Sequence, residues 1–245
     1  MTTDSPKTAM VLAAGLGTRM RPLTDTRPKA LVEVAGKALI DHTLDRLVEV
    51  GVERAVVNVH AFADQMEAHL AGRRDLEILI SDEREAPLET GGGVKKARAL
   101  LGEAPIWVAN SDYVWIGGPG PGGGLAEVAR AWNPARMDSC VIVIPKARTL
   151  GFETPGDFFS DAEGALTPRG SAAAAPLHAF GLQILDPAPV YAEPATAFSL
   201  RNIWFRAAAS RRLIGVQPQG VWMQVGDPAA LRAVSARLAA PLAAP

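Results

Sequence analysis

The sequence contains very little cysteine: Cys140 is the single one among 245 residues. One cysteine excludes an intramolecular disulfide and a cysteine zinc cluster, because both need more than one thiolate. Cys140 lies within the apolar run 139–144, which we interpret as a buried strand. A reactive thiolate needs a partly exposed, electropositive environment, so a catalytic role for this residue is disfavoured.

Neither sign of charge predominates, since 25 Lys and Arg face 26 Asp and Glu and give a net charge of -1. A protein that coats nucleic acid usually carries a strongly basic face, so this balance argues against that class. The apolar runs fall far short of the roughly 18 to 20 residues of a membrane-spanning helix. Residues 1–7 lack the apolar core of a signal peptide. We therefore expect a cytoplasmic protein with no nucleic-acid and no membrane partner.

Apolar residues make up 48% of the chain, enough for one large domain with a sizeable core. In the first part of the chain, short β-type runs alternate with segments of helical periodicity. This alternation indicates right-handed βαβ crossovers and an α/β fold with a mainly parallel sheet. The expected strands are 8–14, 55–59, 76–80, 105–109 and 139–144, and the expected helices are 39–50, 64–70, 93–101 and 125–132.

Ligands of such sheets bind beyond the carboxyl ends of the strands. Gly15 and Asn110 directly follow two of the expected strands, so we expect the chemistry near them. The glycine-rich stretch 117–124 is interpreted as a flexible surface loop rather than an active-site flap, because it lacks side chains that could pack.

The pattern is weaker after Pro145. There we expect strands at 157–159 and 178–185, a helix at 198–209, a hairpin made by 212–216 and 221–225, and a terminal helix at 228–238. We expect the tail 239–245 to be frayed.

The most specific signal is the segment 12–31, in which a strand is followed by a glycine-rich turn and then by cationic residues. Gly15 and Gly17 have no Cβ, so the backbone can approach a phosphate closely and donate N–H groups to it. Arg19 can bridge two phosphate oxygens, and Lys29 offers a point charge. The segment matches neither a Walker A loop nor the dinucleotide fingerprint. An ordinary βα turn with solvated charges is the alternative, but this combination of residues is much rarer than a lone Gly-x-Gly.

The segment resembles the signature of sugar-1-phosphate nucleotidylyltransferases, Leu-x-x-Gly-x-Gly-x-Arg-Met-x-Pro-Leu-Thr with a downstream Pro-Lys-Pro-Leu. Further family-like segments follow in the same order at 88–93, 110–112, 156–158 and 221–226. The resemblance implies a Rossmann-like α/β/α sandwich with a small sugar-binding part. We accordingly expect a single domain in which 1–145 form the nucleotide-binding half and 146–238 the sugar-binding half.

The resemblance also implies a reaction in which a sugar-1-phosphate oxygen attacks the α-phosphorus of an NTP, pyrophosphate leaves and an NDP-sugar forms. Two polyanions must approach each other, so charge neutralisation and in-line positioning supply most of the catalysis. Arg19, Lys29 and Asp112 are the implied catalytic residues, and Asp112 is also the implied ligand of a Mg²⁺ cofactor. A helix cap or an ordinary turn is the alternative role for Asp112.

The remaining expected site residues bind the substrates. The implied nucleotide-binding residues are Ala13, Ala14, Gly15, Gly17, Thr18, Glu89, Thr90, Gly91 and Asn110. The implied sugar-binding residues are Gly156 and Asp157. Two structural alternatives stay open: Thr90 as the cap of a helix that begins near Gly93, and Asp157 as an ordinary loop residue.

The chain departs from the family pattern at Gln224. The family segment Trp-x-Asp-Val-Gly commonly supplies a second Mg²⁺ carboxylate there, whereas a glutamine amide oxygen can coordinate a metal but carries no charge. Asp227 is the alternative ligand, although its position suits capping of the helix after Pro228. We therefore expect a weaker or altered Mg²⁺ dependence.

The resemblance favours UTP and N-acetylmuramic acid α-1-phosphate as substrates, which would place the enzyme in peptidoglycan recycling. One alternative is a guanylyltransferase that uses GTP and mannose 1-phosphate. The other is a weakly catalytic, regulatory nucleotide-sugar-binding protein, which Gln224 keeps open and the presence of Arg19, Lys29 and Asp112 disfavours. The sequence leaves both a monomer and a dimer open.

Overall fold

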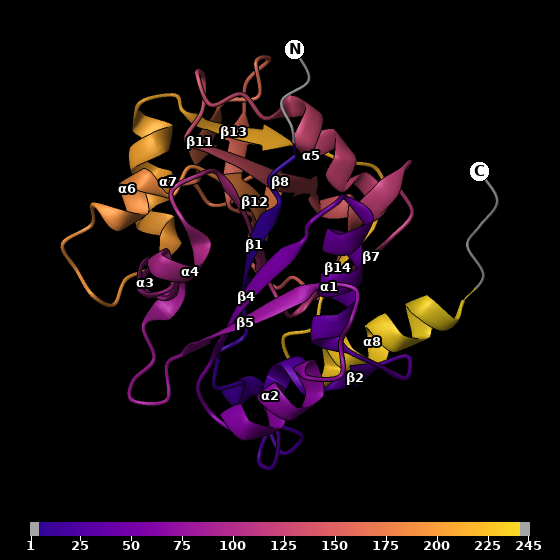
Figure 1. Ribbon diagram of the computed structural model, residues 1–245. Helices are drawn as coiled ribbons and strands as arrows, with labels where there is room; N and C mark the ends of the chain where they lie inside the picture. Colours follow the sequence, from indigo (N-terminus) through magenta and orange to yellow (C-terminus); the bar gives the residue numbers. More distant parts are fainter. Residues whose placement is uncertain (1–4, 241–245) are drawn as a thin grey trace.

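The computed structural model describes residues 5–240 (Figure 1). A nine-stranded sheet forms its centre. The main path of the sheet runs β11 (Leu166–Pro168), β10 (Phe158–Ser160), β12 (Leu177–Leu185), β6 (Ile106–Asn110), β1 (Thr8–Leu12), β4 (Arg54–Val59) and β5 (Glu77–Asp82). In addition, β8 (Ser139–Pro145) pairs with β12, and β13 (Leu213–Val216) pairs with β8.

Strands β6, β1, β4 and β5 are all parallel, and so are β8 and β13. The expected α/β fold with a mainly parallel sheet is therefore confirmed. Strand β12 is antiparallel to its neighbours β6, β8 and β10, and β10 and β11 are antiparallel to each other. The reversal of β12 leaves β6 and β8 running in the same direction on either side of it.

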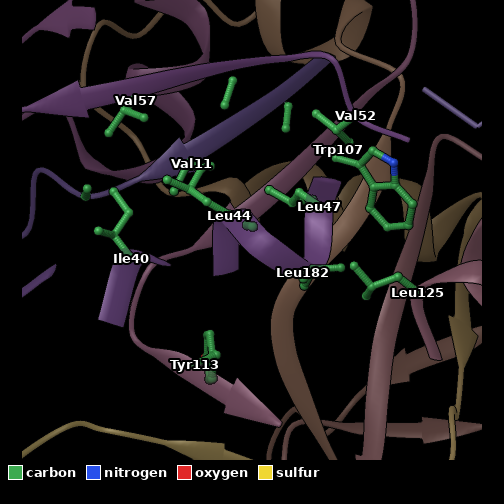
Figure 2. Packing of buried hydrophobic residues seen from close by; sticks show 14 of the residues in the cluster. Val11, Ile40, Leu44, Leu47, Val52, Val57, Trp107, Tyr113, Leu125 and Leu182 are labelled. Carbon is green, nitrogen blue, oxygen red and sulfur yellow. The ribbon is translucent and has the colours of Figure 1, made fainter. Parts of the chain in front are cut away.

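Helices cover both faces of the sheet, as the α/β/α arrangement requires (Figure 1). One face packs against α1 (Leu39–Glu49), α2 (Ala63–Leu70) and α5 (Leu125–Ala131), and the other against α3 (Glu89–Lys96), α4 (Arg98–Leu101), α6 (Ala188–Tyr191) and α7 (Leu200–Ala209). Successive side chains of β1 point to opposite faces of the sheet and so contribute to both hydrophobic layers. Ala9 and Val11 pack on the side of α1, and Met10 packs on the side of α3. Figure 2 shows Leu44 and Leu47 of α1 packed beside Val11 and other buried residues of the sheet.

A second, three-stranded sheet contains β7 (Tyr113–Ile116), β14 (Val221–Gln224) and β9 (Thr149–Leu150). The expected hairpin of 212–216 with 221–225 is therefore wrong, because β13 joins β8 of the large sheet while β14 joins β7. The aromatic rings explain the partner of β14: Trp222 stacks on Trp115 of β7, with ring centroids 5.2 Å apart. Helix α8 (Pro228–Ala239) packs on this small sheet through Val234.

The glycine-rich stretch 117–124 agrees with the expected surface loop at Gly117 and at 119–121, which are exposed, but its end is packed against the protein. Its second half forms a 3-10 turn, Pro121–Gly124, in which residues 122–124 are buried. The N–H of Gly122 donates a hydrogen bond to Glu49 Oε2 of α1 at 2.9 Å. The absence of side chains is what permits this packing, since a Cβ on Gly122 would lie 2.6 Å from Val50 Cγ1.

Element boundaries differ from the expectation mainly around α3. The helix expected at 93–101 begins earlier, at Glu89, and is split at Ala97 into α3 and α4. Three glycines of α3 weaken its intrinsic propensity, and packing on the sheet compensates, with Val94 fully buried. Of the tail predicted to fray, residues 241–245 lie outside the described part of the chain.

Cys140 is buried in β8, and burial raises the pKa of its thiol to about 12. This environment agrees with the expectation that it is not a reactive thiolate. Within residues 5–240, no helix is both long enough and apolar enough to cross a membrane.

Gly120 and Gly122 form a matched pair that tests the packing of the glycine-rich stretch. Both have positive φ, 77° and 69°, so an added Cβ strains either backbone position. A Cβ on Gly120 would meet no atom within 4 Å, whereas one on Gly122 collides with α1. We expect Gly122→Ala to lower the free energy of unfolding by about 1–3 kcal/mol more than Gly120→Ala, as measured by urea denaturation. Equal losses would show that the stretch is not packed.

Candidate active site

A cavity of about 410 Å³ lies at the carboxyl ends of β1 and β6, which are neighbours in the parallel part of the sheet. This is the position at which α/β sheets bind ligands. The lining comes from the turn 13–19 after β1, from residues 87–90 at the start of α3, and from residues 110–112 after β6. Segments far apart in the sequence therefore meet at one site, which we call the first cavity.

The carboxamide of Asn58 on β4 holds the beginning of the glycine turn. Its Oδ1 accepts hydrogen bonds from the N–H groups of Ala13 at 2.6 Å and Ala14 at 3.3 Å. Both residues line the first cavity, but their N–H groups already donate to Asn58 and are therefore not free to bind a ligand. The N–H groups of Gly15 and Gly17, like those of Leu16 and Thr18 in the same turn, have no acceptor among the described residues, so they are available to a bound anion.

Glu83, the residue that follows β5, binds Asn58 in turn. The residue is 1% exposed, and its carboxyl group accepts hydrogen bonds from Asn58 Nδ2 at 2.8 Å and from the N–H of Leu88. Burial raises the pKa of Glu83 above its ordinary value. Gly93 of α3 leaves the necessary room, because a Cβ there would lie 2.9 Å from both Asn58 and Glu83.

Asn58 and Glu83 are not among the site residues expected from the sequence. The available signal was a polar residue inside the apolar run Ala55–Val59, because a buried amide in such a strand needs partners. Glu83 follows the apolar strand β5 directly, and it gave no comparable signal.

The structure brings together the two cationic residues that the sequence singled out. Lys29 Nζ lies 2.6 Å from Asp112 Oδ2, and their side chains are 15% and 18% exposed. Arg19 also lines the cavity and is exposed, close to Gly226, and it has no carboxylate partner among residues 5–240. The cavity therefore offers one unpaired guanidinium beside an ion pair.

Gly17 has the backbone conformation that makes this approach possible. Its φ is 63°, in the left-handed region that glycine tolerates best. A Cβ on Gly17 would lie 2.9 Å from the Cβ of Lys29, so the absent side chain lets the stem of Lys29 pass close to the turn. The carbonyl of Gly17 accepts a hydrogen bond from Thr24 Oγ1 at 2.8 Å, which fixes the turn. Thr18 follows in the lining and is exposed.

Asp112 lies in the tight turn between β6 and β7 and caps no helix. Its carbonyl accepts a hydrogen bond from the N–H of Val225 at 2.9 Å, which connects the turn to the residue after β14. Ser111 donates from both its N–H and its Oγ to the carbonyl of Leu12. These bonds hold the Asp112 carboxylate at the junction of the two sheets, facing the first cavity.

Of the expected nucleotide-binding residues at the start of α3, two line the first cavity and one does not. Glu89 lines the first cavity with a left-handed φ of 59°. Thr90 also lines it, and its Oγ1 accepts a hydrogen bond from the N–H of Leu200 at 2.9 Å. Thr90 thus binds the first N–H of α7 and lies within α3, whose N-cap is Leu88, so the expected capping of a helix that begins near Gly93 is wrong.

Gly91 does not line either cavity. Its N–H donates to the carbonyl of Phe198 at 2.8 Å, and a Cβ on Gly91 would lie 2.3 Å from the ring of Phe198. The structure thus uses this glycine for close packing between α3 and the segment before α7.

A second cavity of about 270 Å³ adjoins the first, and the two share Thr90 and Asn110 in their linings. Asp157 lines the second cavity and is anchored there, because its Oδ2 accepts a hydrogen bond from the N–H of Ala179 at 3.0 Å. Gly156 lies outside the lining, and its carbonyl accepts a hydrogen bond from Arg169 Nε at 3.0 Å. Asp157 is therefore the predicted sugar-binding residue that the structure places at a cavity.

The two doubtful metal ligands lie in different environments. Gln224 lines the second cavity, and its Nε2 donates to the hydroxyl of buried Tyr113 at 3.4 Å. Asp227 lines neither cavity and caps α8, accepting hydrogen bonds from the N–H groups of Ala229 and Ala230 at 2.8 Å each. No group of three or more His, Cys, Asp or Glu side chains within residues 5–240 could hold a metal ion.

Comparison with known proteins gives concordant results. A family model described as nucleotidyl transferase matches residues 8–121. A protein of Caulobacter vibrioides named N-acetylmuramate alpha-1-phosphate uridylyltransferase is 54% identical over 240 residues, which cover 96% of this chain and 98% of the relative. A mannose-1-phosphate guanylyltransferase catalytic subunit beta of Dictyostelium discoideum is 31% identical, over 90% of this chain and 61% of that protein.

Solved structures share the fold at low sequence identity. A UDP-glucose pyrophosphorylase in complex with UDP-glucose superposes with a TM-score of 0.75 at 19% identity, over 95% of this chain and 98% of that one. The Rossmann-like α/β/α sandwich expected from the sequence is thereby confirmed.

The raised pKa of Glu83 predicts how stability depends on pH. A carboxyl group whose folded pKa is raised stabilises the fold fully below its unfolded pKa and loses this contribution as pH rises through its folded pKa. The variant Glu83→Gln keeps an oxygen for Asn58 and cannot ionise. We expect the free energy of unfolding of the unmodified chain, relative to Glu83→Gln, to fall as pH rises above 4.5, in urea denaturation at a series of pH values.

Glu85→Gln, which changes an exposed carboxyl group on the same segment, is the matched control. A difference between the unmodified chain and Glu83→Gln that stays constant with pH would contradict the buried, raised-pKa environment.

Proposed function

This chain belongs to the nucleotidyl transferase family. We propose that, within this family, it is a sugar-1-phosphate uridylyltransferase. It transfers a uridylyl group from UTP to N-acetylmuramic acid α-1-phosphate, releases pyrophosphate and forms the UDP-sugar. The observation that carries this proposal is the 54% identity, over 96% of the chain, to the Caulobacter vibrioides protein of that name. The guanylyltransferase at 31% identity is more distant, so GTP and mannose 1-phosphate are the weaker alternative.

The first cavity suits the triphosphate of the nucleotide. Arg19 and Lys29 supply positive charge, and the N–H groups of Gly15 and Gly17 supply donors that need no rearrangement to meet an anion. Preorganised charges and amides are the main source of catalysis in phosphoryl and nucleotidyl transfer, because the two reacting groups repel each other. The attacking phosphate oxygen is already ionised, so the chain needs no side chain to act as nucleophile or general base.

The second cavity suits the sugar. It shares Thr90 and Asn110 with the first cavity, so substrates bound in the two would meet at these residues. Asp157 offers a carboxylate that can accept hydrogen bonds from sugar hydroxyl or amide groups. We also propose a cytoplasmic location, because the nucleoside triphosphate is a cytoplasmic metabolite.

Mg²⁺ is the proposed cofactor, and Asp112 is the residue that fits it. Mg²⁺ characteristically binds through one or two carboxylates and completes its shell with waters and substrate phosphates. Asp112 provides a partly exposed carboxylate in the first cavity. When bound, the ion would neutralise charge on the triphosphate. Gln224 has its amide nitrogen bonded to Tyr113, which leaves the amide oxygen as the group available for a ligand.

The direct test is pyrophosphate release measured with UTP, GTP, CTP and dTTP against a panel of sugar 1-phosphates. We expect the highest kcat/KM for UTP with N-acetylmuramic acid α-1-phosphate. A preference for GTP with mannose 1-phosphate would favour the guanylyltransferase. Tight binding of the UDP-sugar without turnover would indicate the regulatory alternative.

Two variants test the metal site. Gln224→Asp introduces the charge that the family commonly has there, so we expect the Mg²⁺ concentration for half-maximal activity to fall several-fold. Asp227→Asn is the matched control, because asparagine retains the capping of α8 and Asp227 lines neither cavity. We expect it to leave the Mg²⁺ dependence unchanged. If Gln224→Asp has no effect on the Mg²⁺ curve, position 224 is not a ligand.

A further inference from the structure

The second cavity contains a cation whose role the reaction chemistry leaves open. Arg201 is the single Lys or Arg in the described lining of that cavity, and Asp157 is the single carboxylate. The charges that handle the phosphates, Arg19 and Lys29, line the first cavity instead. A neutral sugar would not need a guanidinium in its binding site.

We propose that Arg201 binds the carboxylate of the 3-O-lactyl group of N-acetylmuramic acid 1-phosphate and so selects this sugar over N-acetylglucosamine 1-phosphate. The two sugars differ in this lactyl group alone, and it carries the one negative charge that they do not share. The inference rests on the proposed function and names the residue that determines its sugar specificity.

The position of Arg201 is well defined by its helix. It lies in the first turn of α7, where its N–H donates to Oγ of the capping residue Ser199 at 3.3 Å. Its guanidinium lies over the ring of Phe205, one turn further along α7, with 5.5 Å between the guanidinium carbon and the ring centroid. Such a cation–π contact restrains the planar group without using its hydrogen-bond donors in the plane.

Most of the donors of Arg201 remain available. Its Nη1 contacts Asp157 Oδ1 at 3.4 Å, and no other side-chain acceptor among residues 5–240 pairs with the guanidinium. An arginine has five N–H donors in a fixed fork, so one long contact leaves an edge that can bind a carboxylate through two parallel bonds.

Asp157 acts as an anchor for Arg201 rather than as a competitor for it. Because Oδ2 of Asp157 is bound to the N–H of Ala179 on β12, only Oδ1 contacts the guanidinium of Arg201. The pair gives the second cavity a formal charge of zero when no sugar is bound. The free edge of Arg201 is then the feature that distinguishes an acidic sugar from a neutral one.

The test compares kcat/KM for N-acetylmuramic acid 1-phosphate and N-acetylglucosamine 1-phosphate at saturating UTP. For Arg201→Met we expect a loss of about 10- to 100-fold with the first sugar, the range for a hydrogen-bonded charge pair, and less than about 2-fold with the second. Arg201→Lys retains the charge without the fork, so it should recover part of the loss. In Arg201→Met the carboxylate of Asp157 loses its partner and can repel the lactyl carboxylate of the sugar. The double variant Arg201→Met/Asp157→Asn removes this repulsion, so the loss that remains measures the attraction by Arg201 alone.

Arg206→Met is the matched control, because Arg206 lies on the same helix, pairs with Glu193 and lines neither cavity. It should leave the ratio of the two kcat/KM values unchanged. Equal losses of kcat/KM with both sugars in Arg201→Met would show that Arg201 serves the shared phosphate or the fold. No loss with either sugar would show that Arg201 does not contact the sugar. Either result overturns the inference while the proposed function stands. If the unmodified chain uses neither sugar, the proposed function and the inference both fail.

Discussion

The ion pair between Lys29 and Asp112 joins the glycine-rich segment to the turn after β6, and the rest of the candidate site is arranged around it. Lys29 comes from the connection that follows β1, and Asp112 from the point where the large and small sheets meet. Both ends are fixed independently, by the close approach at Gly17 and by the bond from Val225 to the Asp112 carbonyl. Positive charge, free backbone amides and a carboxylate are thereby held at one edge of the sheet.

The buried pair Asn58 and Glu83 makes that arrangement rigid. Asn58 binds two amides of the glycine turn, and Glu83 binds Asn58, so the turn is attached to β4 and β5 as well as to β1. A site that stabilises developing charge works best when its donors do not have to reorganise. The cost is a carboxyl group in an apolar environment, which appears as its raised pKa.

The sequence predicted the local parts of this structure well. The strands before Gly15 and Asn110 and the parallel character of the sheet could be predicted because they follow from apolar periodicity and from the order of elements. The reversal of β12, the separation of β13 from β14 and the burial of residues 122–124 could not, because each depends on contacts between distant segments. For the site, motif spacing indicated Arg19, Lys29 and Asp112, whereas a partner such as Asn58 becomes visible only when β4 lies beside β1.

One picture connects these observations: a nucleoside triphosphate lies against the turn 15–19, between Arg19 and Lys29, with the sugar phosphate in the adjoining cavity. A crystal structure of the chain with bound UTP and Mg²⁺ tests this claim most directly. We predict triphosphate oxygens within hydrogen-bond distance of the N–H groups of Gly15 and Gly17 and of the two cations, with Asp112 facing the phosphates. A triphosphate bound far from residues 15–29, with Asp112 turned away, would contradict the account.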